Sequence, residues 1–184
     1  MKAATKCEPC AIGTYAPSVN LNRCLPCEGG HYQPLQGQST CTACPPGSYA
    51  SAGASICNDC PSGKYSSTAG ASTCSNCPAH TFSGVGSIIL LNCTCNKGYT
   101  GPDGVECTAC DAGGFKDTNG SAACTSCSQG KYSTATAAIS KATCSNCPAH
   151  TFSGVGSIIL LNCTCNKGYT GVMVRATLTT LWCY

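Results

Sequence analysis

Apolar side chains are sparse along this chain and do not recur with a helical period. The longest apolar run, Ile-Ile-Leu-Leu, covers only residues 88–91, and it returns at residues 158–161. Elsewhere, single aromatic residues stand between short stretches of Gly, Ser, Ala and Thr. This pattern predicts short hairpin strands, turns and little helix. Each apolar run is expected to form a short strand packed on Phe82 or Phe152, and an exposed binding patch is the alternative.

Cysteine gives the sequence its strongest regularity. The 184 residues include 21 cysteines, most of them in C-x-x-C pairs that begin 16 or 17 residues apart. These pairs start at residues 7, 24, 41, 57, 74, 107, 124 and 144, two C-x-C pairs start at 93 and 163, and Cys183 stands alone. Large apolar residues are too few to form a conventional core, so covalently bonded or metal-bound cysteines are expected to replace it.

The same loop follows every C-x-x-C pair. An aromatic residue comes five positions after the second cysteine in all eight cases. These module aromatics are Tyr15, Tyr32, Tyr49, Tyr65, Phe82, Phe115, Tyr132 and Phe152. Three positions after that cysteine there is Gly in six cases and His80 or His150 in the other two. We expect this Gly to supply the positive φ of a turn and the aromatic to pack on a disulfide of its own module.

One passage occurs twice without a single change. Residues 73–101 and 143–171 both read TCSNCPAHTFSGVGSIILLNCTCNKGYTG. In a repeat array each module is expected to contact only its neighbours, so a duplicated block adds length without disturbing a shared core. The predicted fold is therefore a tandem array of small disulfide-rich modules, built from short β-hairpins and irregular segments and forming an extended rod.

The repeated unit resembles a known family. C-P-x-G-x-Y followed by a cysteine and x-x-C is similar to the ephrin-receptor-like cysteine-rich repeat of the growth-factor-receptor and TNF-receptor group. CPAHTFSGVGSIILLNCTCNKGYTG resembles the EGF-like element that closes such arrays. The resemblance implies four repeats over residues 7–76, an EGF-like element over 77–109, two repeats over 110–146 and a second EGF-like element over 147–171. Residues 1–6 are then a leader and residues 172–184 an atypical tail.

The resemblance also implies a disulfide pairing, in which the cysteine that opens each C-P-x-G-x-Y unit bonds the next cysteine along the chain. This gives Cys10–Cys24, Cys27–Cys41, Cys44–Cys57, Cys60–Cys74, Cys77–Cys93, Cys95–Cys107, Cys110–Cys124, Cys127–Cys144 and Cys147–Cys163. A loop of about this size stabilises a fold by ~3 kcal/mol. Cys165–Cys183 is an uncertain further pair. Cys7 is left unpaired, and no signal peptide precedes it, so we expect a fragment or a truncated gene model.

Zinc is the alternative to disulfides. The spacing between C-x-x-C pairs is close to that of zinc ribbons, and eight pairs would make four sites of four thiolates. The C-x-C pairs do not fit this scheme. Three N-glycosylation sequons, at Asn92, Asn119 and Asn162, favour a secretory compartment. We therefore expect disulfides, with no bound metal and no cofactor.

The remaining residues narrow the function by what they lack. The net charge of +3 is carried by scattered basic residues, which predicts no nucleic-acid interface, and no stretch approaches the ~20 apolar residues of a transmembrane helix. No catalytic constellation is evident, so we expect no enzyme. The expected function is an extracellular or cell-surface stalk, adhesion or protein-binding segment with an unidentified protein or carbohydrate ligand, and attachment to a membrane through a longer parent protein stays open. A ligand-binding receptor ectodomain fragment and an intracellular zinc-binding array are the alternatives.

Overall fold

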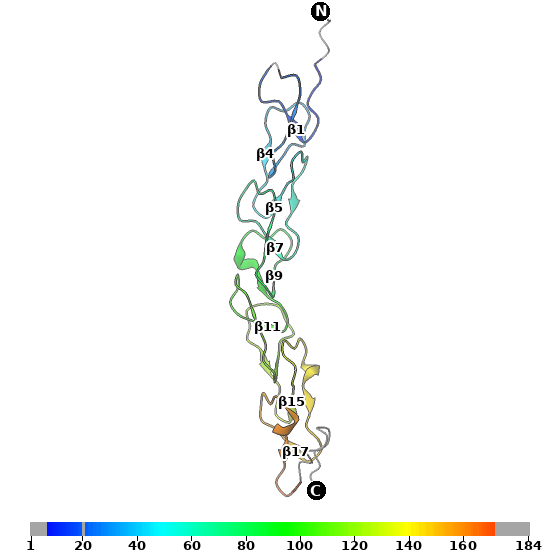
Figure 1. Ribbon diagram of the computed structural model, residues 1–184, viewed down its shortest axis with the longest axis vertical. Coiled ribbons are helices and arrows are strands. Elements are labelled where there is room, and N and C mark those ends of the chain that lie inside the picture. The colour runs from blue at the N-terminus through cyan, green and yellow to red at the C-terminus, as the bar shows by residue number, and fades with distance from the viewer. Residues whose placement is uncertain (1–6, 20, 172–184) are drawn as a thin grey trace, which may run out of the picture. The chain divides into compact units, whose positions relative to one another are not determined.

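Two-residue strands and turns make up nearly all of the regular structure. The computed structural model describes residues 7–19 and 21–171, and no α-helix occurs among them (Figure 1). The chain divides into two compact units, one ending at Cys93 and the other beginning at Thr94. The prediction of small disulfide-rich modules with short hairpins and little helix is confirmed.

The first unit is a succession of antiparallel hairpins. Its described elements are β1 (Thr14–Tyr15), β2 (Leu25–Pro26), β3 (His31–Tyr32), β4 (Thr42–Ala43), β5 (Ser48–Tyr49), β6 (Asn58–Asp59), β7 (Lys64–Tyr65), β8 (Ser75–Asn76), β9 (Thr81–Phe82) and the 3₁₀ turn η1 (Leu90–Asn92). Within this unit the two-stranded sheets are β1–β2, β3–β4, β5–β6 and β7–β8. Consecutive strands therefore pair with each other, and the sheets have no crossover.

The second unit repeats the same plan. Its described elements are β10 (Thr94–Cys95), β11 (Tyr99–Thr100), β12 (Thr108–Ala109), β13 (Gly114–Phe115), β14 (Thr125–Ser126), β15 (Lys131–Tyr132), η2 (Lys141–Thr143), β16 (Ser145–Asn146), β17 (Thr151–Phe152), η3 (Leu160–Asn162) and β18 (Thr164–Cys165). Within this unit the sheets are β11–β12, β13–β14, β15–β16 and β17–β18.

The hairpin register explains the role of the C-x-x-C motif. In the hairpin of β5 and β6, Tyr49 pairs with Asn58, and Cys57 and Cys60 flank the strand that contains Asn58. Cys57 closes its own module by bonding Cys44, whereas Cys60 opens the next module. The two central residues of the motif are thus a strand, whose extended backbone separates the two cysteines and directs them to adjacent modules. We use "module" below for the segment closed by one disulfide.

Main-chain hydrogen bonds join each module to the next. At the first junction, the Gly13 N–H donates to the Gln33 carbonyl at 2.7 Å, and the Cys27 N–H donates to the Gly13 carbonyl at 2.9 Å. The Gly37 N–H donates to the Cys10 carbonyl at 2.8 Å. Equivalent bonds recur at later junctions in both units. Because these bonds use backbone atoms only, no particular side chain is needed to form them.

The turn glycines also approach a module two positions further along the chain. A Cβ atom added to Gly13 would lie 2.2 Å from the Gly53 carbonyl oxygen, and one added to Gly30 would lie 1.9 Å from the Gly70 carbonyl oxygen. These distances are too short for a real Cβ, so only glycine allows the approach. The expectation that each module contacts only its nearest neighbours is therefore wrong.

Cysteine sulfur forms most of the interior. The largest fully buried side chains are Cys27, Cys44, Cys60, Cys93, Cys95, Cys110, Cys127 and Cys163, together with Ser83 and Ser153. Phe115 is the only module aromatic that is buried, at 7% exposed, whereas Phe82 and Phe152 are 41% and 46% exposed. In the described residues the aromatics therefore contribute less to the core than expected, and the disulfides contribute more.

The two Ile-Leu segments do not form the packed strands that the sequence predicts. Residues 88–89 lead into η1 and residues 158–159 lead into η3, so each apolar run bends into a single 3₁₀ turn. Leu160 packs partly against Cys163. The other apolar side chains of these runs are largely exposed. A strand is not favoured here because the Asn at the end of each run binds back to the backbone at its start.

Candidate functional site

The structure joins the cysteines in the nine pairs that the family resemblance implies. The bonds are Cys10–Cys24, Cys27–Cys41, Cys44–Cys57, Cys60–Cys74, Cys77–Cys93, Cys95–Cys107, Cys110–Cys124, Cys127–Cys144 and Cys147–Cys163. They close loops with sequence separations of 12 to 17 residues. A bonded cysteine is neither a thiolate ligand nor a nucleophile, so these residues hold the modules together and offer no chemistry of their own.

Three cysteines fall outside this ladder. Cys7 is exposed and is the free cysteine among the described residues. Cys165 is disulfide-bonded. Cys183 lies outside the described residues, so the pairing of Cys165 with Cys183 stays a prediction.

All three sequon asparagines lie at the surface, and each uses its side-chain oxygen in the same way. Asn92 Oδ1 accepts a hydrogen bond from the Ile89 N–H at 3.2 Å. Asn162 Oδ1 accepts from the N–H groups of Ile158 and Ile159, both at 3.2 Å. Asn119 Oδ1 accepts from the Lys97 N–H at 3.0 Å. Their exposure is compatible with glycosylation, which stays a prediction.

The module turn requires the left-handed backbone conformation. All six module glycines have positive φ, between +72° and +87°, which confirms the role expected for them. His80 and His150 occupy the same position with φ of +59° and +60°. The ring of His150 stacks on Tyr169, with centroids 4.2 Å apart. Both histidines are exposed turn residues.

A buried lysine was missed by the sequence interpretation. Lys116, at 3% exposed, follows the module aromatic Phe115. Its Nζ donates to the carbonyls of Tyr99, at 2.7 Å, and Gly120. Burial lowers the pKa of Lys116, and the nearby Asp103 carboxylate opposes that shift. In the other repeats of the C-x-x-C loop, the position after the aromatic holds a small or amide side chain. Alignment of the eight loops would therefore have singled out Lys116 as an exception at this position.

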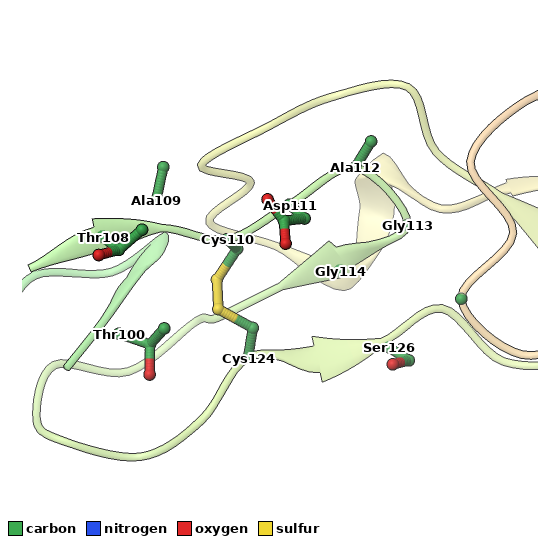
Figure 2. A pocket seen from close by; sticks show the side chains of 11 residues that line it. Thr100, Thr108, Ala109, Cys110, Asp111, Ala112, Gly113, Gly114, Cys124 and Ser126 are labelled. Carbon is green, nitrogen blue, oxygen red and sulfur yellow. A yellow bond between two sulfur atoms is a disulfide. The ribbon is translucent and has the colours of Figure 1, made fainter.

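A shallow depression of about 310 Å³ lies in the second unit, beside the Cys110–Cys124 disulfide. Its lining residues are Thr100, Thr108, Ala109, Cys110, Asp111, Ala112, Gly113, Gly114, Cys124, Ser126 and Gly156. Figure 2 shows the disulfide at its centre, with short side chains and backbone around it. The lining offers one carboxylate and three hydroxyls but no base beside a nucleophile. Such a surface can accept polar groups of a partner.

Two absences among the described residues bear on function. No group of three or more His, Cys, Asp or Glu side chains is placed to hold a metal ion in the part of the chain that the structure describes. Within residues 7–19 and 21–171, no helix has the length and apolar character needed to cross a bilayer.

The tandem arrangement of disulfide-closed hairpins defines a class of cysteine-rich repeat protein. The chain matches the family model described as tyrosine-protein kinase ephrin type A/B receptor-like over residues 18–55, 47–85 and 98–144, which together span more than half of its length. The chain therefore belongs to the family of ephrin-receptor-like cysteine-rich repeats. A search of curated proteins found no match. The repeat family is typically non-catalytic, and no enzyme family was found to match.

Proposed function

We propose that this chain is an extracellular or cell-surface segment that acts as a structural stalk, adhesion or protein-binding module. The observation that carries the proposal is the sulfur core. Nine disulfides take the place of a hydrophobic interior, and such bonds persist in oxidising compartments outside the cytosol. The family match supports the same environment.

The surface supports a binding role over a catalytic one. The depression beside Cys110–Cys124 is lined by backbone and short polar side chains, which suit contacts with a protein or a carbohydrate. We further propose that Asn92, Asn119 and Asn162 carry N-linked glycans, because each is exposed and lies in a sequon. The EGF-like boundaries 77–109 and 147–171 are part of the same proposal.

A thiol and metal count tests the proposal directly. The chain would be expressed through a secretory route, alkylated without reduction and analysed by mass spectrometry and metal analysis. We expect one to three alkylated thiols, Cys7 among them, no zinc, and peptides linked through Cys44–Cys57 and Cys60–Cys74. About twenty alkylatable thiols with several zinc ions per chain would overturn the proposal in favour of an intracellular metal-binding array.

A receptor ectodomain is a narrower form of the same function. Secreted, oxidised chain immobilised on a biosensor would be screened against panels of extracellular proteins and glycans. Saturable binding to one protein would favour a receptor, and weak binding to many carbohydrates would favour adhesion. Reduced and alkylated chain is the control, because a ligand of the folded modules should not bind it.

A further inference from the structure

The two Ile-Leu turns, residues 88–91 and 158–161, are the longest apolar runs of the chain, and most of their side chains are exposed. Ile88, Ile89, Leu90 and Leu91 are 50%, 44%, 40% and 63% exposed. In the second copy Ile158, Ile159 and Leu161 are 47%, 39% and 45% exposed. Four consecutive exposed apolar residues mark an interaction surface or an aggregation liability. The question is what covers them.

Both turns end at a sequon. Asn92 is the last residue of η1 and Asn162 is the last residue of η3. Each asparagine is exposed, and its Oδ1 is turned back toward the start of the turn, where it accepts the backbone N–H of Ile89 or Ile159. Among the described residues, neither Nδ2 atom has a hydrogen-bond partner. The nitrogen that a glycan would use is therefore available at both sites.

The planar amide fixes the direction in which a sugar leaves the side chain. In a trans secondary amide the substituent on nitrogen lies on the same side as the carbonyl oxygen. A sugar bonded to Nδ2 therefore leaves beside Oδ1, and Oδ1 faces the backbone of Ile89 in the first copy and of Ile159 in the second. The first sugar ring is directed toward the Ile-Leu turn.

We propose that N-linked glycans on Asn92 and Asn162 cover the two Ile-Leu turns, with the apolar face of the first sugar ring packed on the exposed Ile and Leu side chains. This inference rests on the extracellular function proposed above. It assigns the glycans a shielding role: they keep two duplicated apolar segments from associating with other chains. The glycan that covers each Ile-Leu turn is thus covalently attached to the asparagine at the end of that turn.

The third sequon provides an internal comparison. Asn119 Oδ1 accepts from the Lys97 N–H, and its neighbours in sequence are Thr118 and Gly120. No run of exposed large apolar side chains adjoins Asn119 in sequence. A glycan on Asn119 therefore has no apolar turn to cover, and its loss should leave the apolar exposure of the molecule unchanged.

The buried middle residue of each sequon further predicts that the sugar is attached before the module closes, although the asparagine itself stays exposed. The middle residue of each sequon, Cys93 or Cys163, is 0% exposed and disulfide-bonded. A transferase needs the sequon in an accessible chain. In the step itself, Nδ2 forms a bond to C1 of the sugar, the bond from C1 to a lipid-linked pyrophosphate carrier breaks, and the amide loses one proton to a base. Reductant added to cells during synthesis should therefore raise occupancy at Asn92 and Asn162.

Three secreted forms of the full chain test the shielding role: the wild type, Thr94→Ala with Thr164→Ala, and Ser121→Ala. The first variant removes two sequons but keeps the asparagines that cap η1 and η3, and the second removes only the Asn119 sequon. Glycopeptide mass spectrometry measures occupancy, and disulfide mapping verifies the fold. Binding of an environment-sensitive apolar dye and light scattering at increasing concentration measure exposure and self-association.

We expect glycans at Asn92 and Asn162 in the wild type. The double variant should bind several-fold more dye and self-associate, and Ser121→Ala should behave as the wild type. Adding Ile89→Ser and Ile159→Ser to the double variant should abolish the gained dye signal, which locates it at the turns. Trimming wild-type glycans to the first sugar should preserve the shielding, and a gain of dye binding on trimming would rule out direct packing of that ring.

The outcomes separate this inference from the proposed function. Intact disulfides with unoccupied Asn92 and Asn162 would overturn the shielding role alone. Occupied sites with unchanged dye binding in the double variant would do the same. Reduced cysteines throughout the chain would instead overturn the extracellular function on which both rest.

Discussion

The glycine found in six of the eight module turns meets two separate demands. It adopts positive φ, and at several positions it also leaves room for a carbonyl from a module two steps further on. The first demand is readable from the sequence, because Pro followed by Gly two residues later is a turn signal. The second demand cannot be predicted from the sequence, because it depends on how three modules stack and does not affect the local spacing of residues.

Alanine at two of these glycines should separate the demands. Gly63→Ala places a Cβ in open space at φ +78°, so it should cost only the left-handed strain, roughly 1 kcal/mol. Gly30→Ala carries the same strain at φ +87° and also drives its Cβ to 1.9 Å from the Gly70 oxygen. We expect Gly30→Ala to cost about 3 kcal/mol, since overpacking adds to strain. Denaturant unfolding with the disulfides intact measures both, and equal losses would show that only φ matters.

Lys116 makes stability depend on pH in the alkaline range. Burial lowers its pKa below the ordinary value of 10.5, so the unfolded chain holds this proton more tightly than the folded chain. The free energy of unfolding should therefore increase as pH rises from the lowered folded-state pKa to 10.5. The Lys116→Met variant should not show this increase in the free energy of unfolding. At neutral pH it should be less stable than the wild type, because the carbonyls of Tyr99 and Gly120 lose their hydrogen bonds from the ammonium group.

Urea unfolding across this pH range measures the effect as the difference between wild type and Lys116→Met. The two proteins differ only at residue 116, so the difference between their profiles reports on Lys116. A Cys7→Ser background prevents thiol exchange at high pH. Parallel pH profiles for the two proteins would contradict the assignment of Lys116 as a buried charged group.

At the level of the element, the hairpins were predictable and the Ile-Leu turns were not. The C-x-x-C spacing and the aromatic five residues later specify each hairpin, because the two cysteines flank one strand and the aromatic lies in a strand that pairs in a hairpin. The Ile-Leu runs were expected to pack because apolar residues generally do. The competing interaction is local: Asn92 and Asn162 hydrogen-bond to the backbone three residues earlier and bend each run into a 3₁₀ turn.

Removal of a disulfide should destabilise the hairpin that it closes. Cys44→Ala with Cys57→Ala opens a loop of sequence separation 13 and removes a sulfur that is 0% exposed at Cys44. We expect a loss of ~3 kcal/mol from loop entropy, with a further loss from the cavity. Amide hydrogen exchange of the β5–β6 hairpin measures the change. Cys7→Ser is the matched control, since that thiol is free and exposed, and an effect as large there would contradict the role given to the ladder.

At the scale of the whole molecule, contacts beyond nearest neighbours give identical sequences different surroundings within the described residues 7–19 and 21–171. The structure departs here from a simple linear repeat, in which stability is a sum of module and nearest-neighbour terms. Gly98 and Gly168 occupy equivalent positions in the two copies of the 29-residue block. Gly98 donates its N–H to the Lys116 carbonyl at 2.9 Å, and a Cβ there would lie 2.3 Å from the Ala137 oxygen. A Cβ at Gly168 would meet no described atom within 4 Å.

Hydrogen exchange at these two amides should therefore differ although their local sequences are the same. We expect the Gly98 amide to be protected at least tenfold more than the Gly168 amide, because opening at Gly98 breaks contacts with two later modules, and tenfold protection corresponds to about 1.4 kcal/mol. Resonance assignment distinguishes the copies directly, and by mass spectrometry the peptides must extend past residue 101 or 171. Equal protection would mean that each block folds by its own sequence alone, and that the close approach of alternate modules adds nothing to stability.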